Sequence, residues 1–389
     1  MNRDTQQHAV VVGGSLGGLV TAAALRAANW DVTVYEASAH ELESRGGGVV
    51  LQPDVTQAFE FAGVAVPHPP GVLSGDRIYL DESDRIVSRF YMPQMQTSWS
   101  LLYKALKRAQ PDGGLRAGER FTRFEDDGER VTAHFESGHQ HTADLLIGAD
   151  GVRSTLRTLL EPETQPHYAG YVAWRGLIEE PDLPAFAADK LRDRFAFSDG
   201  VGHSALAYMV PGEDDSTEPG RRRWNWVWYR RYDTNELQDL LVDRDGVQRP
   251  FSLPPGTARQ AVIDRLKEEA QTLLGPTFRA LVHATDVPFM QPIVDVQTRS
   301  MRYGRVLLTG DAASVPRPHT AGSTAKAAAN AYALALELEA AQQPQHAGEG
   351  ALNRALSRWN AEQLRVGRAM TTRGIMLGNQ LMRIPAHSV

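Results

Sequence analysis

The first forty residues alternate between short apolar runs and a small-residue segment. Val10 to Val12 form an apolar run typical of a buried strand, and Asp31 to Glu36 alternate as a half-buried strand does. Between them, residues 18–28 are small and apolar, which favours a helix that packs closely on a sheet. The pattern predicts a β-α-β unit.

Strand patterns dominate the middle of the chain. Residues 116–147 predict three antiparallel strands, with hairpin turns at Asp127-Gly128 and Ser137-Gly138. Residues 168–232 are rich in strand-forming and aromatic residues and predict a separate, larger sheet. The remaining predicted elements are a helix over 258–274, a short buried strand over 305–308, an alanine-rich helix from Ser323 and a helix over 351–382.

The turn between the first strand and helix nearly matches the Gly-x-Gly-x-x-Gly phosphate-binding pattern. Gly13 and Gly18 hold the first and last positions, but Ser15 holds the middle one. Serine is tolerated there if its dihedrals are ordinary, and its hydroxyl can bond a phosphate. Glu36 ends the next strand, where an acid would meet a ribose hydroxyl. These features predict a dinucleotide site; the alternative is a turn that only packs.

Two further segments place an aspartate at the carboxyl end of a strand. GADGVRS contains Asp150, and TGDAAS contains Gly310 and Asp311. Asp150 could order the loop near a pyrophosphate, and Asp311 could accept hydrogen bonds from a ribityl chain. Either aspartate alone is more typical of a strand-end cap, so the prediction rests on their joint occurrence with the glycine turn.

Together the three segments resemble the FAD-dependent aromatic hydroxylases, the single-component group typified by para-hydroxybenzoate hydroxylase. YAGYVAWRG, GGGVVLQP and RVLLTGDAASVPRPHTAGSTAKA resemble the dihydroxypyridine hydroxylases within it, which also carry serine in the glycine turn. The resemblance implies non-covalent FAD, NADH or NADPH as a transient reductant, and hydroxylation through a flavin C4a-hydroperoxide. The implied substrate is a small electron-rich aromatic or hydroxypyridine-like ring, with O₂ as the second reactant.

The resemblance also implies the residues that bind the cofactor. Gly13, Ser15 and Gly18 would hold the pyrophosphate, and the flavin edge would lie at the helix that begins near Ala321. The full predicted cofactor set is Gly13, Gly14, Ser15, Leu16, Gly18, Glu36, Arg45, Val50, Asp150, Gly310, Asp311, Ala321, Gly322, Ser323 and Thr324.

Several positions depart from the pattern of the wider group. Ser314 replaces a histidine, Ala321-Gly322-Ser323 replaces Gly-Gln-Gly, and Asn330 replaces an acid. Trp99 stands where an arginine often opens a helix, so Arg45 is the candidate to replace that cofactor contact.

The expected fold is a mixed α/β arrangement in which a Rossmann-like FAD-binding domain is interleaved with a mainly antiparallel substrate-binding sheet, followed by C-terminal helices. The FAD-binding domain is assigned to residues 1–72, 99–166 and 291–389, the last including the helices. The substrate domain is assigned to residues 73–98 and 167–290.

Proton transfer from a ring hydroxyl would most naturally use histidine near neutral pH. His203 and His319 are the catalytic candidates, with a packed or surface histidine as the alternative for each. Gln52, Tyr208 and Pro318 are the substrate candidates, and parity places His203 and Tyr208 on opposite faces of one strand. His139 and His141 alternate on a strand and are interpreted as two solvent-facing residues. No metal site is expected.

Composition narrows the function classes. A net charge of −6 argues against nucleic-acid binding, and no apolar stretch reaches the length of a membrane span. The absence of cysteine excludes thiolate chemistry and fits a cytoplasmic location.

The last helix would cover the flavin domain or make a homodimer contact. The alternatives are a tailoring or antibiotic-inactivating monooxygenase acting on a multi-ring substrate, and a non-catalytic flavin-bound redox sensor; a halogenase is disfavoured because no Ile-Pro follows WNWVWY.

Overall fold

The computed structural model describes residues 6–40, 47–346, 348 and 350–385. The predicted β-α-β unit is present as β1 (His8–Val12), α1 (Leu16–Ala27) and β2 (Asp31–Glu36). It belongs to a six-stranded sheet in the order β16-β17-β10-β1-β2-β6, parallel except for the β16–β17 pair. The other strands are β6 (Leu115–Ala117), β10 (Leu145–Gly148), β16 (Arg302–Tyr303) and β17 (Val306–Leu308).

The predicted three-stranded meander is present, but its third strand was predicted too long. β7 (Phe121–Asp126), β8 (Val131–Phe135) and β9 (Gln140–Ala143) form the antiparallel sheet. The apolar run that follows, β10, joins the parallel sheet instead, with all four residues buried. Parallel strands are covered on both faces and need such continuous apolar runs, whereas β9 is partly exposed and alternates.

The larger sheet has nine strands in the order β18-β15-β11-β14-β13-β12-β4-β5-β3 and is antiparallel except for the β12–β4 pair. Its strands are β3 (Gly48–Val50), β4 (Val72–Leu80), β5 (Ile86–Ser98), β11 (His167–Glu179), β12 (Arg194–Gly200), β13 (His203–Val210), β14 (Arg223–Arg231), β15 (Phe289–Gln297) and β18 (Ser314–Val315). Its strands alternate along the chain with those of the parallel sheet. The domain boundaries themselves stay a prediction.

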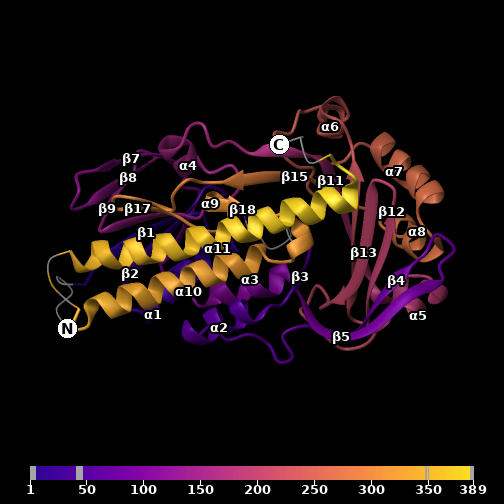
Figure 1. Cartoon of the computed structure of the whole chain (residues 1–389), viewed down its shortest axis with the longest axis horizontal. Helices are drawn as coiled ribbons and strands as arrows, with labels where there is room; N and C mark the ends of the chain where they lie inside the picture. The colour runs from indigo at the N-terminus through magenta and orange to yellow at the C-terminus, as the bar shows by residue number, and fades with distance from the viewer. Residues whose placement is uncertain (1–5, 41–46, 347, 349, 386–389) are drawn as a thin grey trace.

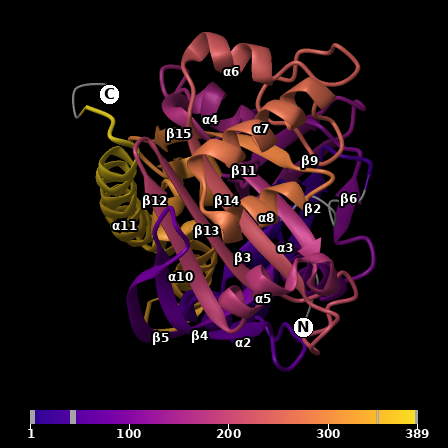
Figure 2. The same ribbon diagram turned by 90° about the vertical axis from the view of Figure 1, so that its right-hand side faces the viewer.

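The outer face of the nine-stranded sheet is covered by helices, as Figure 2 shows for α5 (Ala185–Leu191), α7 (Gln260–Leu273) and α8 (Pro276–His283). Trp224, Trp226 and Trp228 point to this side and are fully buried in its core. Because side chains alternate along a strand, Asn225, Val227 and Tyr229 face the other way, toward the parallel sheet. The inner face is therefore free to line a site.

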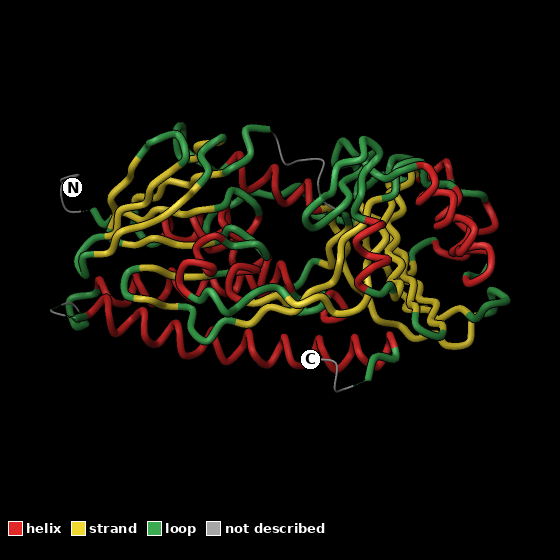
Figure 3. Tube along the Cα trace, turned by 90° about the horizontal axis from the view of Figure 1, so that it is seen from above, coloured by secondary structure: helices red, strands yellow, loops and turns green. Residues whose placement is uncertain are grey.

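The parallel sheet is packed between a helical layer and the meander (Figures 1 and 3). The layer contains α1, α2 (Pro53–Phe61), α3 (Trp99–Arg108) and α10 (Ser323–Gln342). α11 (Ala351–Met382) packs along α10 and continues to the nine-stranded sheet, so it joins the two halves (Figure 1). The shorter helices are α4 (Thr155–Leu160), α6 (Thr234–Leu240), α9 (Gly310–Ala313) and the 3₁₀ turns η3 (Glu180–Asp182) and η4 (Pro318–Thr320).

None of the helices in the described part of the chain combines the length and apolar composition that a membrane crossing requires.

Candidate active site

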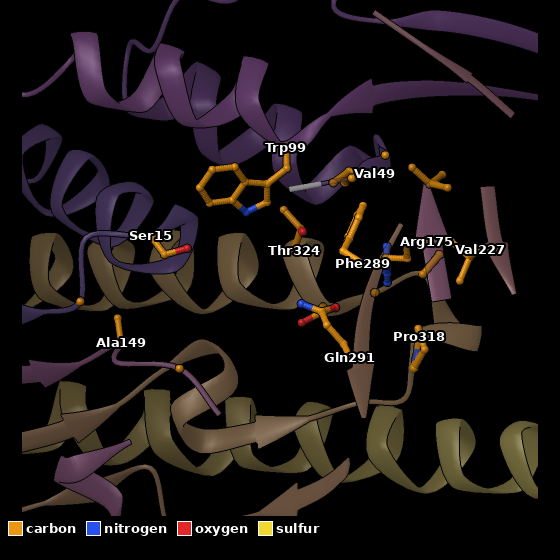
Figure 4. A pocket seen from close by; sticks show the side chains of 18 of the residues that line it. Ser15, Val49, Trp99, Ala149, Arg175, Val227, Phe289, Gln291, Pro318 and Thr324 are labelled. Carbon is orange, nitrogen blue, oxygen red and sulfur yellow. The ribbon is translucent and has the colours of Figure 1, made fainter. Parts of the chain in front are cut away.

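A cavity of about 570 Å³ lies between the carboxyl edge of the parallel sheet and the inner face of the nine-stranded sheet. Such a volume is typical of a small-molecule or cofactor site. Figure 4 shows Ser15 and Ala149 at one end, Arg175, Val227 and Phe289 at the other, and Trp99 and Thr324 between them. The cavity is therefore elongated and joins two chemically different ends.

The glycine turn forms the first end of the cavity. Gly13 has a φ of +110°, and a Cβ there would lie 2.3 Å from the carbonyl oxygen of Ala149. A Cβ on Gly18 would lie 1.8 Å from the carbonyl oxygen of Gly13. The two glycines thus allow the turn to fold tightly beside the loop that follows β10. Gly14 donates its N–H to Glu36 Oε2 at 2.7 Å, which holds the turn on β2.

Ser15 occupies the middle position without strain. Its φ of −84° is ordinary for an L-residue, and its side chain makes no capping bond to α1 although it stands at the N-cap. Ser15 lines the cavity, whereas Leu16 and Gly18 are buried behind it. The hydroxyl and the first amides of α1 are therefore placed to receive an anion at the positive end of the helix.

The two predicted aspartates differ in their contacts, and only Asp150 is adjacent to the turn. Asp150 lines the cavity, and its buried Oδ1 has no hydrogen-bond partner in the described chain. Burial raises the pKa of Asp150, opposed by hydrogen bonds from Ser154 and the Leu156 amide. Asp311 Oδ1 accepts a hydrogen bond from Ser323 Oγ at 2.6 Å and does not itself line the cavity. An unpaired buried acceptor calls for a donor from a ligand, such as a sugar hydroxyl.

The start of α10 forms the middle of the cavity wall. Residues 321–324 line it, and Gly322 caps the helix without a side-chain hydrogen bond. The first amides of α10 are therefore available to a ligand and carry the positive end of the helix dipole. Gln52 donates from Nε2 to the carbonyl oxygen of Ala321 at 2.5 Å, so it supports this segment rather than lining the cavity. Gly310 lies behind the segment 321–324 and donates its N–H to Asn330 Oδ1.

These features fit a dinucleotide such as FAD: a turn that admits no Cβ at Gly13 or Gly18, an unsatisfied buried acceptor and an uncapped helix lie along one cavity. Val50 and Pro318 also line it. Trp99, which replaces the arginine of the wider group, lines it and stacks on Tyr103 with ring centroids 4.8 Å apart. Arg45 lies outside the described residues.

The far end of the cavity contains groups that sequence reasoning missed. Of the predicted substrate residues, Tyr208 lies there. Arg175, Tyr229, Phe289 and Gln291 join it from β11, β14 and β15. The only sequence signal for Arg175 was a lone charge within the apolar strand YVAWRGLI. A charged residue in a strand more often faces water. That the Arg175 side chain points into the cavity could be seen only from the pairing of β11 with its neighbouring strands.

Neither predicted catalytic histidine lines the cavity. His203 points to the outer face, where Trp228 Nε1 donates to its Nδ1 at 3.3 Å. His319 lies behind Pro318, with Nε2 2.9 Å from the Tyr171 hydroxyl. Burial lowers the pKa of each to about 4, with smaller contributions from Arg230 and Arg317 respectively. Both histidines are neutral at pH 7, and their catalytic roles stay predictions.

The interpretation of His139 and His141 as solvent-facing was wrong. Both are half-buried, and both lie within hydrogen-bond distance of the Tyr35 hydroxyl, at 3.0 and 2.6 Å. The meander folds back over the end of β2, which covers this face of the strand. Burial, followed by the neighbouring His8, lowers the pKa of His141 to about 4.

Comparisons with known proteins add independent information. The family described as "NAD(P)-binding Rossmann-like domain" matches residues 11–41, and that described as "FAD binding domain-like" matches residues 168–295. The chain is 32% identical over 341 residues to 2,6-dihydroxypyridine 3-monooxygenase of Paenarthrobacter nicotinovorans, covering 85% of this chain and 82% of the relative. It is 27% identical to 6-hydroxynicotinate 3-monooxygenase of Bordetella bronchiseptica, covering 83% and 80%.

Solved structures agree with the fold. The structure of 2,6-dihydroxypyridine-3-hydroxylase from Arthrobacter nicotinovorans superposes with a TM-score of 0.89 at 29% identity, covering 97% of this chain and 93% of that one. A salicylate hydroxylase in complex with substrate superposes with a TM-score of 0.74 at 18% identity, covering 99% and 91%, which speaks for the fold alone.

Proposed function

The chain belongs to the FAD-dependent aromatic hydroxylases, and we propose that it uses NADH or NADPH and O₂ to hydroxylate a small, electron-rich nitrogen heterocycle of the hydroxypyridine type. The observation that carries the proposal is the one cavity that runs from the glycine turn to an aromatic sheet wall. The two relatives named above act on hydroxylated pyridine rings by their names, which supports this choice of ring.

In this proposal the chain holds FAD along the cavity. Ser15 and the amides of the glycine turn would bind the diphosphate, and Glu36 the adenosine ribose. The predicted contact of Asp311 with the ribityl chain would be made beside Ser323, which lines the cavity and donates to Asp311 Oδ1. The uncapped start of α10, residues 321–324, lies against the flavin and favours negative charge on the reduced ring. Bound FAD supplies hydride acceptance and the activation of O₂ for transfer of one oxygen atom.

The residues around the far end prepare the ring for reaction. Val49, Phe195 and Phe289 enclose it with apolar surface, which excludes water from the reacting centre. Tyr208, Tyr229 and Gln291 supply neutral hydrogen-bonding groups that fix the orientation of the ring.

The test uses purified protein with its flavin. We expect bound FAD in the absorbance spectrum, and faster NAD(P)H oxidation when hydroxypyridines are added, with one oxygen atom gained in the product by mass spectrometry. Phenols and a tetracyclic ring system serve as comparison substrates. The proposal fails if the protein takes up no FAD, or if no hydroxypyridine both accelerates reductant oxidation and gains oxygen. Efficient oxygenation of the tetracyclic ring alone would favour the multi-ring alternative.

A further inference from the structure

Arg175 brings the only formal charge to the sheet end of the cavity among the described residues that line it. Its Nε is buried and has no hydrogen-bond partner, and the guanidinium forms no ion pair within the described part of the chain. A Cβ built on Gly47 would lie 3.5 Å from Arg175 Nη1, so the backbone before β3 closes over the group. Figure 4 shows the side chain between Phe289 and Val227.

Strand register places this cation in the middle of an apolar row. Arg175 on β11 is opposite Val227 on β14 and Phe289 on β15, and Leu206 on β13 is opposite Val227. The other rows are neutral and polar, with Tyr229 and Gln291 on one side and Asn225 and Tyr208 on the other. Asn225 Nδ2 is also buried without a partner.

Among the residues that the structure describes, none offers this cation a counter-charge. The carboxylates that line the described cavity, Glu36, Glu119 and Asp150, belong to the dinucleotide end. Burial raises the pKa of both Tyr208 and Tyr229, opposed by Arg175, so both phenols are neutral at ordinary pH. Arg175 is half-buried, and a cation that is partly removed from water without a partner is costly, whereas a charge-assisted hydrogen bond to an oxyanion is strong and can be bidentate.

We propose that Arg175 binds the ring substrate through an anionic oxygen in the plane of the ring, so that a hydroxylated heterocycle is bound as its conjugate base. The inference rests on the proposed function, which identifies the ligand as a ring substrate. The ring O–H bond breaks before or on entry, and the proton passes to the solvent. Deprotonation then follows from the charge of Arg175 and needs neither His203 nor His319 as a base.

The test measures equilibrium binding to the FAD-loaded protein without reductant. The probes are 2,6-dihydroxypyridine, its dimethoxy counterpart, which cannot ionise at oxygen, and pyridine-2-carboxylate. We expect Arg175→Gln to weaken binding of dihydroxypyridine about 10- to 100-fold, and that of the dimethoxy compound less than threefold. Arg175→Lys should retain part of the affinity. Arg365→Gln, an exposed arginine on α11, is the matched control and should bind as the unaltered protein does.

The pH dependence separates charge from shape. The affinity of the unaltered protein for dihydroxypyridine should increase as the pH is raised to the pKa of the ring hydroxyl and level off above it. Arg175→Gln should remove this increase. An Arg175-dependent affinity for the carboxylate alone would assign the anionic oxygen to a carboxylate instead of a ring oxygen. Equal affinity of Arg175→Gln and unaltered protein for both anions, with FAD content and hydroxylation retained, overturns the inference and leaves the proposed function standing. Absence of both binding and hydroxylation overturns both.

Discussion

At the residue scale, the neighbouring glycines Gly17 and Gly18 differ in how much space the turn leaves for a side chain. A Cβ on Gly18 would lie 1.8 Å from the carbonyl oxygen of Gly13, whereas a Cβ on Gly17 would meet Ala327 Cβ at an ordinary 3.7 Å. Gly18→Ala should therefore distort the turn and abolish FAD retention. Gly17→Ala should retain FAD and stabilise α1 by up to about 1 kcal/mol, because alanine favours a helix. Thermal unfolding and flavin absorbance of the purified variants measure both effects; equal FAD content in the two variants would contradict the close packing at Gly18.

Buried histidines make the fold less stable at acid pH. Burial lowers the pKa of His203 to about 4, below the value near 6.5 of an unfolded chain. Between these values the unfolded chain binds a proton that the folded chain does not, so the free energy of unfolding falls as the pH decreases from about 6.5 toward 4. His203→Gln should reduce this loss, by up to about 2 kcal/mol between pH 7 and pH 5. Denaturant unfolding at pH 7 and pH 5 measures it.

The control is His346→Gln, at an exposed position. It should leave the difference between the two pH values unchanged. If His203→Gln also leaves that difference unchanged, His203 is not the group that resists protonation in the folded chain.

At the scale of elements, the apolar pattern of the sequence predicted those helices and strands whose bounds depend on neighbouring residues. The strand at Asp31–Glu36 and the helix over 351–382 have the predicted bounds, because their apolar periodicity is set by immediate neighbours. The boundary between β9 and β10 was missed, because only one residue, Asp144, separates two strands that belong to different sheets. Local sequence carries little information about which distant strand each one joins.

The candidate site divides in the same way. The glycine turn, Asp150 and the start of α10, which line the cavity, could be singled out from the sequence because each is a short motif whose chemistry is local; their roles in binding stay predictions. Arg175 was missed because its direction depends on pairing with Val227 and Phe289, more than fifty and one hundred residues away. Which residues line the far end of the cavity therefore depends on how distant strands pair. A single sequence predicts the individual strands but not their pairing.

At the scale of the whole molecule, one buried arginine joins the two halves. Arg317 precedes the η4 turn beside the cavity, and its Nε and Nη2 donate to the two carboxylate oxygens of Asp295 on β15, at 2.8 and 2.6 Å. Its Nη1 donates to Asn379 Oδ1 on α11 at 2.8 Å. Only 1% of Arg317 is exposed. The nine-stranded sheet, the long helix and the loop beneath the cavity thus meet at one guanidinium.

Breaking this junction should destabilise the whole fold. Arg317→Met leaves Asp295 buried without its partner, and we expect the free energy of unfolding to fall by about 3–5 kcal/mol, measured by denaturant unfolding. Arg365→Met, which removes an exposed arginine paired with Glu362, should leave the midpoint unchanged. Adding Asp295→Asn to Arg317→Met removes the stranded charge and should recover part of the loss. If the double variant is no more stable than Arg317→Met alone, the loss comes from packing of the side chain, and the charge pair is not what holds the two halves together.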